Sequence, residues 1–178
     1  MSVSDDRTPA AGLSDLEFIT INPGDELLRE AVAANEHARS AYAMQLQHYA
    51  KAGYEEPWVG YLVRKEGVLV GVCSFIGSPT EGKVEIAYFT FPEYEGKGIA
   101  TGMCRRLLEI ARRHDSSILV TAHTLPRDGP STRILVKNEF RLAGTTTDPD
   151  EGVVWDWHYL GGLPPERGRP AAENSARI

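Results

Sequence analysis

Cysteine is scarce in this sequence, and long apolar runs are missing from it. Two cysteines occur among 178 residues, Cys73 and Cys104, and their spacing matches no metal-binding pattern. Both lie among apolar neighbours, so we expect reduced thiols in the core of a cytoplasmic protein, with no disulfide and no bound metal. No segment is apolar over the roughly 20 residues that a membrane span needs, and no secretory signal pattern is present. We therefore expect no membrane contact.

Positive charge is also in short supply. The chain has 19 Lys and Arg against 25 Asp and Glu, a formal net charge of −6, and a sequence pI of about 5.4. This balance disfavours nucleic acid and anionic membranes as partners. It leaves room for cationic amines or basic proteins as substrates, although the same charge is ordinary for solubility. A hydrophobic content of 42% over this length suits one globular domain.

The ends of the chain differ in composition from its middle. Residues 1–13 are polar and contain Pro9 and Gly12, and residues 161–178 are rich in Gly, Pro and Arg. We expect a flexible N-terminal arm, a single domain over residues 14–160 and a disordered C-terminal tail.

The most informative stretch is residues 84–101, which read VEIAYFTFPEYEGKGIAT. The pattern predicts a strand, a glycine turn and a helix that begins near Ile99. Gly96 and Gly98 leave the turn free of side chains, and a helix start supplies unpaired N–H donors and the positive end of the helix dipole. Such a turn favours phosphate binding. The dinucleotide fingerprint fails, because Thr101 occupies its third glycine position, and no P-loop Gly-Lys-Ser/Thr follows.

The remaining elements follow from apolar periodicity and turn residues. We expect a strand over residues 16–21 and two helices within residues 26–51, broken near Asn35 and stopped at Gly53. Further strands are expected at 58–64, 68–76 and 117–123, a short helix at 131–137, and a final hairpin at 140–146 and 153–159. The order is β-α-α-β-β-β-α-β-α-β-β, with a right-handed crossover between the fourth and fifth strands.

Two motifs in this order carry a family resemblance. EYEGKGIAT at residues 93–101 resembles the acyl-CoA pyrophosphate loop of the GNAT N-acetyltransferases, Q/R-x-x-G-x-G/A, with Glu95 at the Q/R position. Residues 131–140, S-x-R-I-L-x-K-x-E-F, resemble the family's closing motif, N-x-x-S-x-R-V-L-x-K-x-G-F, most closely in the branch of ribosomal-protein N-terminal acetyltransferases and their relatives. Here Asp128 stands at the Asn position and Glu139 at the Gly position.

The resemblance covers roughly residues 16–160 and implies an α/β (mixed α+β) GNAT fold, a central sheet of about seven strands with helices on both faces. It further implies an N-acetyltransferase that moves an acetyl group from acetyl-CoA to a primary amine by direct attack in a ternary complex. A homodimer is an additional possibility. The residues that the motifs assign to the coenzyme are Phe89, Thr90, Phe91, Glu95, Gly96, Lys97, Gly98, Ile99, Ala100, Thr101, Asp128 and Arg133.

Catalysis would need a base, because an ammonium group cannot attack a thioester. The family's Val-Glu-Ile-Gly-Tyr strand matches residues 84–88, which makes Glu85 the candidate base; the alternative is a strand-end carboxylate that reaches water. Alternation along the strand places Glu85 on an apolar face, which would raise its pKa. Ser131 matches the position that often protonates the leaving thiolate, and its alternative role is a helix N-cap.

Other polar groups have weaker assignments. The backbone N–H groups of residues 89–91 are candidates for stabilising the oxyanion, because GNAT proteins splay this strand from the next. Tyr88 is interpreted as a core residue, and His123 and His158 as strand histidines without a catalytic role. Trp155 and Trp157 share a face with Tyr159 and are expected in the core or a pocket wall.

Glu95 presents an electrostatic conflict. A carboxylate about 4 Å from a pyrophosphate charge would cost on the order of 4 kcal/mol at an effective dielectric constant near 20. We therefore expect Glu95 to point outward, toward Lys97 or Arg105, while the backbone binds. Arg127, Arg133 and Lys97 are candidate partners of the 3′-phosphate or else solvated charges.

The departures at Glu95, Asp128 and Glu139 leave an alternative function open, a non-catalytic acyl-CoA-binding or sensor module. The acceptor also stays open, since a small amine, an amino acid and a protein N-terminus all fit the sequence.

Overall fold

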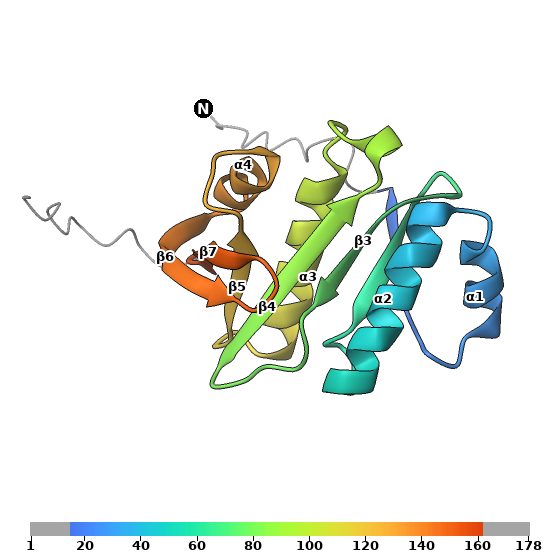
Figure 1. Cartoon of the computed structure of the whole chain (residues 1–178), viewed down its shortest axis with the longest axis horizontal. Coiled ribbons are helices and arrows are strands. Elements are labelled where there is room, and N and C mark those ends of the chain that lie inside the picture. The colour runs from blue at the N-terminus through green and yellow to red at the C-terminus, as the bar shows by residue number, and fades with distance from the viewer. Residues whose placement is uncertain (1–14, 162–178) are drawn as a thin grey trace, which may run out of the picture.

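The protein is described by a computed structural model that covers residues 15–161 (Figure 1). The predicted arm over residues 1–13 and almost all of the predicted tail over residues 161–178 lie outside the described residues. No helix within residues 15–161 combines the length and apolar character that crossing a membrane requires.

The predicted order of elements is confirmed, and each predicted boundary lies within two residues of the observed one. A short 3-10 turn, η1 (Pro92–Tyr94), is additional. The elements in chain order are β1 (Leu16–Thr20), α1 (Glu26–Val32), α2 (Glu36–Ala52), β2 (Gly60–Lys65), β3 (Val68–Phe75), β4 (Lys83–Thr90), α3 (Ile99–His114), β5 (Leu119–Thr124), α4 (Pro130–Lys137), β6 (Phe140–Asp148) and β7 (Gly152–Tyr159).

Side-chain caps explain where the first two helices begin. The carboxylate of Asp25 accepts a hydrogen bond from Leu28 N, and the amide oxygen of Asn35 accepts one from Ala38 N, both at 2.9 Å. Each cap satisfies one of the backbone donors that a helix start leaves unpaired. The predicted break near Asn35 is therefore a new N-cap, and α2 ends at Gly53, whose φ is 89°.

The seven strands of the described chain form one mixed sheet in the order β1-β2-β3-β4-β5-β7-β6. Neighbouring strands are antiparallel except β4 and β5, which run parallel and are connected through α3. Figure 1 shows α2 in front of the sheet and α3 behind it, so the expected helices on both faces are confirmed.

The parallel pairing of β4 and β5 is short. It comprises Lys83 with Leu119, Val84 with Val120 and Glu85 with Thr121. Beyond these pairs β4 continues to Thr90 beside β3, while β5 continues to Thr124 beside β7. The sheet therefore opens after Glu85, and this opening positions the candidate site.

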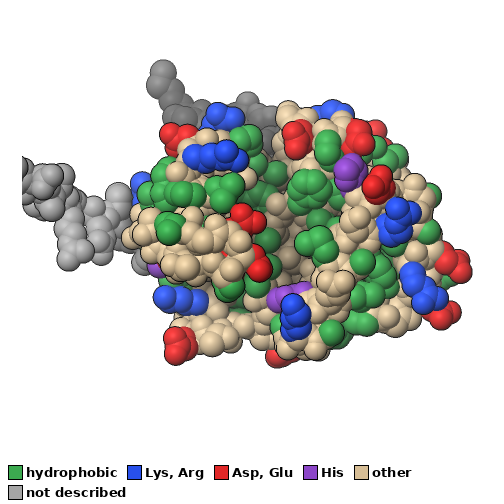
Figure 2. Space-filling model, viewed as in Figure 1, with side chains coloured by type: hydrophobic (Ala, Val, Ile, Leu, Met, Phe, Trp, Pro, Cys, Tyr) green, Lys and Arg blue, Asp and Glu red, His purple; other side chains and the backbone are tan. Residues whose placement is uncertain are grey.

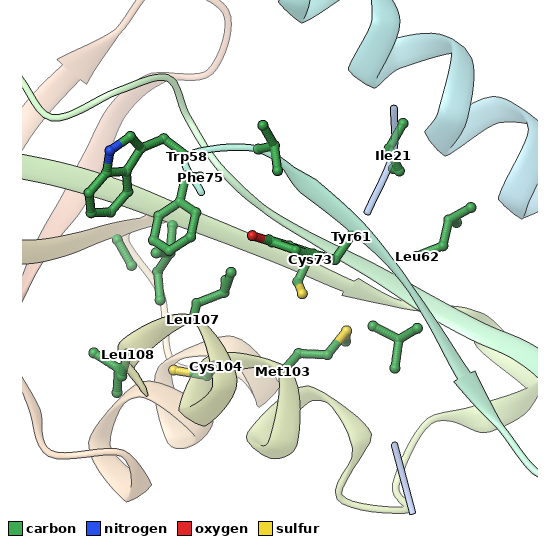
Figure 3. Packing of buried hydrophobic residues seen from close by; sticks show 14 of the residues in the cluster. Ile21, Trp58, Tyr61, Leu62, Cys73, Phe75, Met103, Cys104, Leu107 and Leu108 are labelled. Atoms are coloured by element: carbon green, nitrogen blue, oxygen red, sulfur yellow. The ribbon is translucent and has the colours of Figure 1, made fainter. Parts of the chain in front are cut away.

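The apolar core includes the layer between α3 and the sheet. Figure 3 shows Met103, Cys104 and Leu107 of α3 beneath Leu62, Cys73 and Phe75 of the sheet. Both cysteines are free and buried, as expected. Burial raises the pKa of the Cys73 thiol and raises that of Cys104 to about 12, so neither thiol is ionised near neutral pH.

Candidate active site

The glycine turn after β4 presents unpaired backbone donors. Gly96 and Gly98 have φ values of 73° and 79°, a left-handed region that favours glycine, and an added Cβ at either position would meet no atom within 4 Å. Gly98 is the N-cap of α3 and supplies no side-chain cap. The first intrahelical bond runs from Gly102 N to Gly98 O at 3.1 Å. The N–H groups of residues 99–101 are therefore without intrahelical acceptors.

These donors border a cavity of about 460 Å³ between the turn and α4, which we call the loop cavity. Most of the predicted coenzyme residues line it, namely Phe89, Thr90, Glu95, Gly96, Gly98, Ile99, Ala100, Thr101 and Arg133. The sequence interpretation missed further lining residues from the strand, the turn and the last helix: Tyr88, Tyr94, Pro130, Ile134 and Lys137.

Three predicted coenzyme residues do not line the loop cavity, and the prediction for Phe91 needs correction. The Phe91 side chain is fully buried, and its backbone N–H donates to Val70 O at 2.9 Å. Because antiparallel hydrogen bonding alternates along a strand, the β4 groups directed away from β3 are those of Tyr88 and Thr90. Asp128 is exposed ahead of α4, and Lys97 is exposed on the turn.

Lys97 is engaged locally. Its Nζ donates to Glu93 O at 3.1 Å and lies 5.1 Å from the centre of the Tyr94 ring. Within residues 15–161 no ion pair joins Glu95 to Lys97 or Arg105, the two groups toward which the sequence analysis expects it to point. Glu95 is exposed and lines the loop cavity, together with the cations Arg133 and Lys137.

A second cavity of about 460 Å³ opens on the other side of Pro130 and Ser131, and we call it the Glu85 cavity. It is lined by Glu85, His123, Thr124, Leu125, Arg127, Gly129, Pro130, Ser131, Thr132, Asp148, Glu151 and Val154. Pro130 and Ser131 also line the loop cavity, so the two spaces adjoin at the start of α4. Figure 2 shows a hollow between the β6–β7 hairpin and the α2 side of the molecule, with acidic side chains beside it.

Glu85 is a partly buried carboxylate, with 31% of its side chain exposed. Burial raises its pKa, the nearby carboxylates of Asp148 and Asp156 raise it further, and His123 opposes this rise. The direction of the shift agrees with the expectation from strand alternation. A raised pKa brings a carboxylate closer to the range in which a general base works well.

His123 contacts Glu85, which the sequence interpretation did not foresee. Its Nδ1 lies 3.2 Å from Glu85 Oε1, and its Nε2 lies 3.6 Å from Asp156 Oδ1. His158 Nε2 lies 2.9 Å from Asp156 Oδ2. Both histidines do lie on strands, β5 and β7, as expected. No signal in the sequence shows this contact, because it depends on the parallel pairing of Glu85 with Thr121, which brings His123, two residues later, to the same face.

Ser131 is exposed between the two cavities and is not the helix cap. The N-cap of α4 is Gly129, with Pro130 at the first helical position. The Thr132 hydroxyl bonds back to this cap residue, since its Oγ1 accepts from Gly129 N at 3.0 Å and donates to Gly129 O at 2.9 Å. The N-cap interpretation of Ser131 is therefore wrong, and its hydroxyl is available for another role.

The aromatic residues near the site are mainly structural. Tyr88 packs against the core, and its hydroxyl lies 3.5 Å from Ser131 O. Burial raises the pKa of the Tyr88 hydroxyl, so it stays protonated. Trp157 is buried and donates from Nε1 to Thr124 Oγ1 at 3.0 Å, while Trp155 and Tyr159 are partly buried against the core.

The residues of the loop cavity suit a diphosphate. Backbone N–H groups at a helix start, glycines whose missing side chains leave open space, and two cations against one carboxylate all favour bound negative charge. Within the described residues no group of three or more His, Cys, Asp or Glu side chains is arranged to hold a metal ion. The fold and the site together define an acyl-CoA-dependent acyltransferase.

The comparison with known families agrees. The profile of the acetyltransferase (GNAT) domain matches residues 7–141, and the chain belongs to this family. It is an N-acetyltransferase that uses acetyl-CoA. No curated protein sequence matches the chain.

Solved structures share the fold at low identity. An apo structure of RimL, a ribosomal L7/L12 alpha-N-protein acetyltransferase, is 18% identical with a TM-score of 0.62, covering 82% of this chain and 92% of its own. The spermidine/spermine N-acetyltransferase SpeG from Vibrio cholerae is 17% identical with a TM-score of 0.60, covering 83% and 94%. The IAA acetyltransferase from Bacillus cereus ATCC 14579 is 15% identical with a TM-score of 0.55, covering 80% and 96%. A further RimL structure contains coenzyme A.

Proposed function

We propose that this N-acetyltransferase acetylates a cationic primary amine by direct attack in a ternary complex, with Glu85 as general base and Ser131 as proton donor. The observation that carries the proposal is the shared boundary of the two cavities. The loop cavity fits the coenzyme, the Glu85 cavity contains the base, and Ser131 lines both. An amine beside Glu85 would therefore meet a thioester beside Ser131.

Glu85 can accept the proton that the amine must lose before it attacks the thioester. An amine with a lysine-like pKa of about 10.4 is free base in roughly one molecule in a few thousand at pH 7, whereas an α-amino group near 7.7–8.0 is far less protonated. A positioned general base contributes about 10²–10⁴ in rate. Burial raises the pKa of Glu85, which strengthens it as a proton acceptor.

Groups of β4 and α4 act on the thioester, where they stabilise the carbonyl oxygen and protonate the departing sulfur. Tyr88 and Thr90 direct backbone groups into the opening between β4 and β5, where an N–H can stabilise negative charge on the carbonyl oxygen. The Ser131 hydroxyl is free of the capping role and can donate its proton to the departing sulfur. The buried, protonated thiols of Cys73 and Cys104 are unsuited to forming an acyl-enzyme, which supports direct transfer.

The Glu85 cavity supports a positively charged acceptor. Asp148 and Glu151 line it with Glu85, against one arginine, Arg127. The solved relatives are named for two amines of this kind, a ribosomal protein α-amino group and spermidine. We propose a cationic amine of either sort, a polyamine or a protein N-terminus.

The test is release of free thiol from acetyl-CoA over a panel that includes spermidine, single amino acids and peptides with free N-termini. We expect turnover with cationic amines and little with acidic amino acids. Coenzyme A, but not ATP or NAD, should raise the Tm, because a ligand that binds only the folded state stabilises it. Stabilisation by coenzyme A with no thiol released from any amine would support the sensor module instead.

Two further expectations belong to the same proposal. Free buried cysteines support a reducing compartment such as the cytoplasm. A homodimer remains a prediction, and sedimentation of the purified protein would test it.

A further inference from the structure

The side chain of His123 is fixed between two carboxylates on different strands. Nδ1 lies 3.2 Å from Glu85 Oε1 of β4, and Nε2 lies 3.6 Å from Asp156 Oδ1 of β7. Nδ1 is shielded from solvent and forms no hydrogen bond within the described residues. Since a buried polar atom needs a partner, the Glu85 carboxylate at 3.2 Å is the group toward which this nitrogen can turn.

The carboxylate behind His123 is itself held in place. His123 and Asp156 are directly paired residues of the antiparallel strands β5 and β7. The second oxygen of Asp156 lies 2.9 Å from His158 Nε2, and His158 pairs with Arg141 of β6. The His123 ring therefore lies between carboxylates of the strands on either side of β5, and 25% of its side chain is exposed.

The other charged groups around Glu85 are mostly of its own sign. Asp148 of β6 and Asp156 of β7 disfavour ionisation of Glu85, and Glu151 of the β6–β7 turn lines the same cavity. Arg127 lines the same cavity, but within the described residues it forms no ion pair with Glu85. His123 is consequently the group that can present a positive charge to Glu85 at contact distance.

We propose that His123 is a positioning residue for the base: when protonated, it keeps the Glu85 carboxylate ionised and in one orientation within an otherwise acidic cavity. His123 acts on Glu85 and does not itself touch the amine. The inference rests on the proposed function, because His123 acts only through Glu85, the proposed base.

The first test is the pH dependence of kcat/KM for the whole chain, since its acid limb reports the essential base of the free enzyme. His123→Gln removes the cation and should move the acid limb upward by on the order of one pH unit, about a tenfold loss of kcat/KM below the limb. The matched variant is His158→Gln, which removes an imidazole that contacts Asp156 but not Glu85, and it should move the limb much less. A His123→Gln variant with an unmoved acid limb, or an equal shift in His158→Gln, overturns the proposal.

The second test does not depend on turnover. In wild-type protein labelled with ¹³C at glutamate side chains, the Glu85 carboxyl signal, assigned through Glu85→Gln, should show two titration steps. The larger is its own and the smaller reports loss of the neighbouring imidazole proton, because coupled groups share their titrations. The smaller step should persist in His158→Gln and vanish in His123→Gln. A single step in the wild type overturns the proposal, whereas two steps with a fully active Glu85→Gln would instead reject Glu85 as the base.

Discussion

Glu85 and Thr121 form the last pair in which β4 and β5 run side by side. Before this pair the two strands share parallel ladder bonds, and after it they separate toward β3 and β7. The carboxylate of Glu85 thus lies at the point where the sheet begins to open and lines the cavity formed there. This relationship underlies the predictions that follow.

Glu85→Gln should lower kcat/KM by about 10²–10⁴, the contribution typical of a positioned general base. Thiol release from acetyl-CoA with an accepted amine measures it. Stabilisation by coenzyme A should be unchanged, because Glu85 does not line the loop cavity. Glu109→Gln on the exposed face of α3 serves as the control, because Glu109 lines neither cavity. A Glu85→Gln variant with wild-type turnover would remove Glu85 from the mechanism.

The same substitution should stabilise the fold at neutral pH. The pKa of Glu85 is raised by burial, so its protonated form is favoured in the folded state. Protonation of Glu85 therefore stabilises the folded state. This stabilisation is complete below the pKa of the unfolded chain, near 4.3, and is lost as pH rises through the raised pKa of the folded state. Glu85→Gln mimics the protonated form, so its Tm should exceed that of the wild type at pH 7, and the two should converge below about pH 4. Scanning calorimetry across this range measures the difference. Equal Tm values at pH 7 would contradict it.

Two adjacent hydroxyls of α4 should separate catalysis from stability. Ser131→Ala should reduce kcat at least tenfold while leaving the Tm unchanged, because Ser131 does not cap the helix. An acid that transfers a proton in the transition state contributes about 10²–10⁴. Thr132→Ala should instead cost about 1 kcal/mol of stability, since the buried Thr132 hydroxyl makes two hydrogen bonds to Gly129. Urea denaturation and steady-state kinetics of both variants test the separation. Loss of stability in Ser131→Ala would restore a capping role.

Glu139→Gly should stabilise the protein. Glu139 has a φ of 66° at the turn between α4 and β6, at the position where the motif of the family has glycine. A left-handed conformation costs an ordinary residue about 1–2 kcal/mol, and the greater freedom of unfolded glycine offsets part of the gain. We expect a net gain of about 0.5–1 kcal/mol, or a Tm increase of roughly 1–4 °C. Glu139→Ala removes the same carboxylate but keeps Cβ, so it should bring no gain. Equal effects of the two substitutions would show that charge and not φ matters.

Charge changes along the loop cavity should alter coenzyme affinity in opposite directions. Glu95→Gln should tighten coenzyme A binding by less than tenfold, because Glu95 is exposed and solvent screens its charge. Arg133→Gln and Lys137→Gln should weaken binding several-fold, more so at low salt. Titration calorimetry at two salt concentrations measures all three. A gain above tenfold in Glu95→Gln would place its carboxylate against the diphosphate.

The fold was largely predictable because its signals are local. Asp25 and Asn35 cap helices where the sequence has a cap residue before a periodic run, and Gly98 precedes α3 as the turn pattern requires. The apolar residues Ile99, Met103, Leu107 and Ala111 recur at helical spacing and are buried on one face of α3, while Ile110 is partly buried.

The motif marks the backbone of residues 98–101, which lines the loop cavity, whereas hydrogen-bond partners outside the motif could not be predicted from the sequence. The N–H of Phe91 donates to Val70 O of β3. Alternation along β4 alone could not show this, because the register with β3 decides which N–H groups are paired. Gly129 is the N-cap of α4 and Ser131 is not, because the helix begins one residue earlier than expected.

The sequence by itself determined the order of elements, the glycine turn at the start of α3 and the presence of a carboxylate on the preceding strand, since each depends on neighbours in the chain. Only the tertiary structure decided that His123 and Asp156 stand behind Glu85 and that Ser131 separates two cavities. Those contacts join β4, β5, β7 and α4, and the register between strands, which sets them, is a property of the assembled sheet.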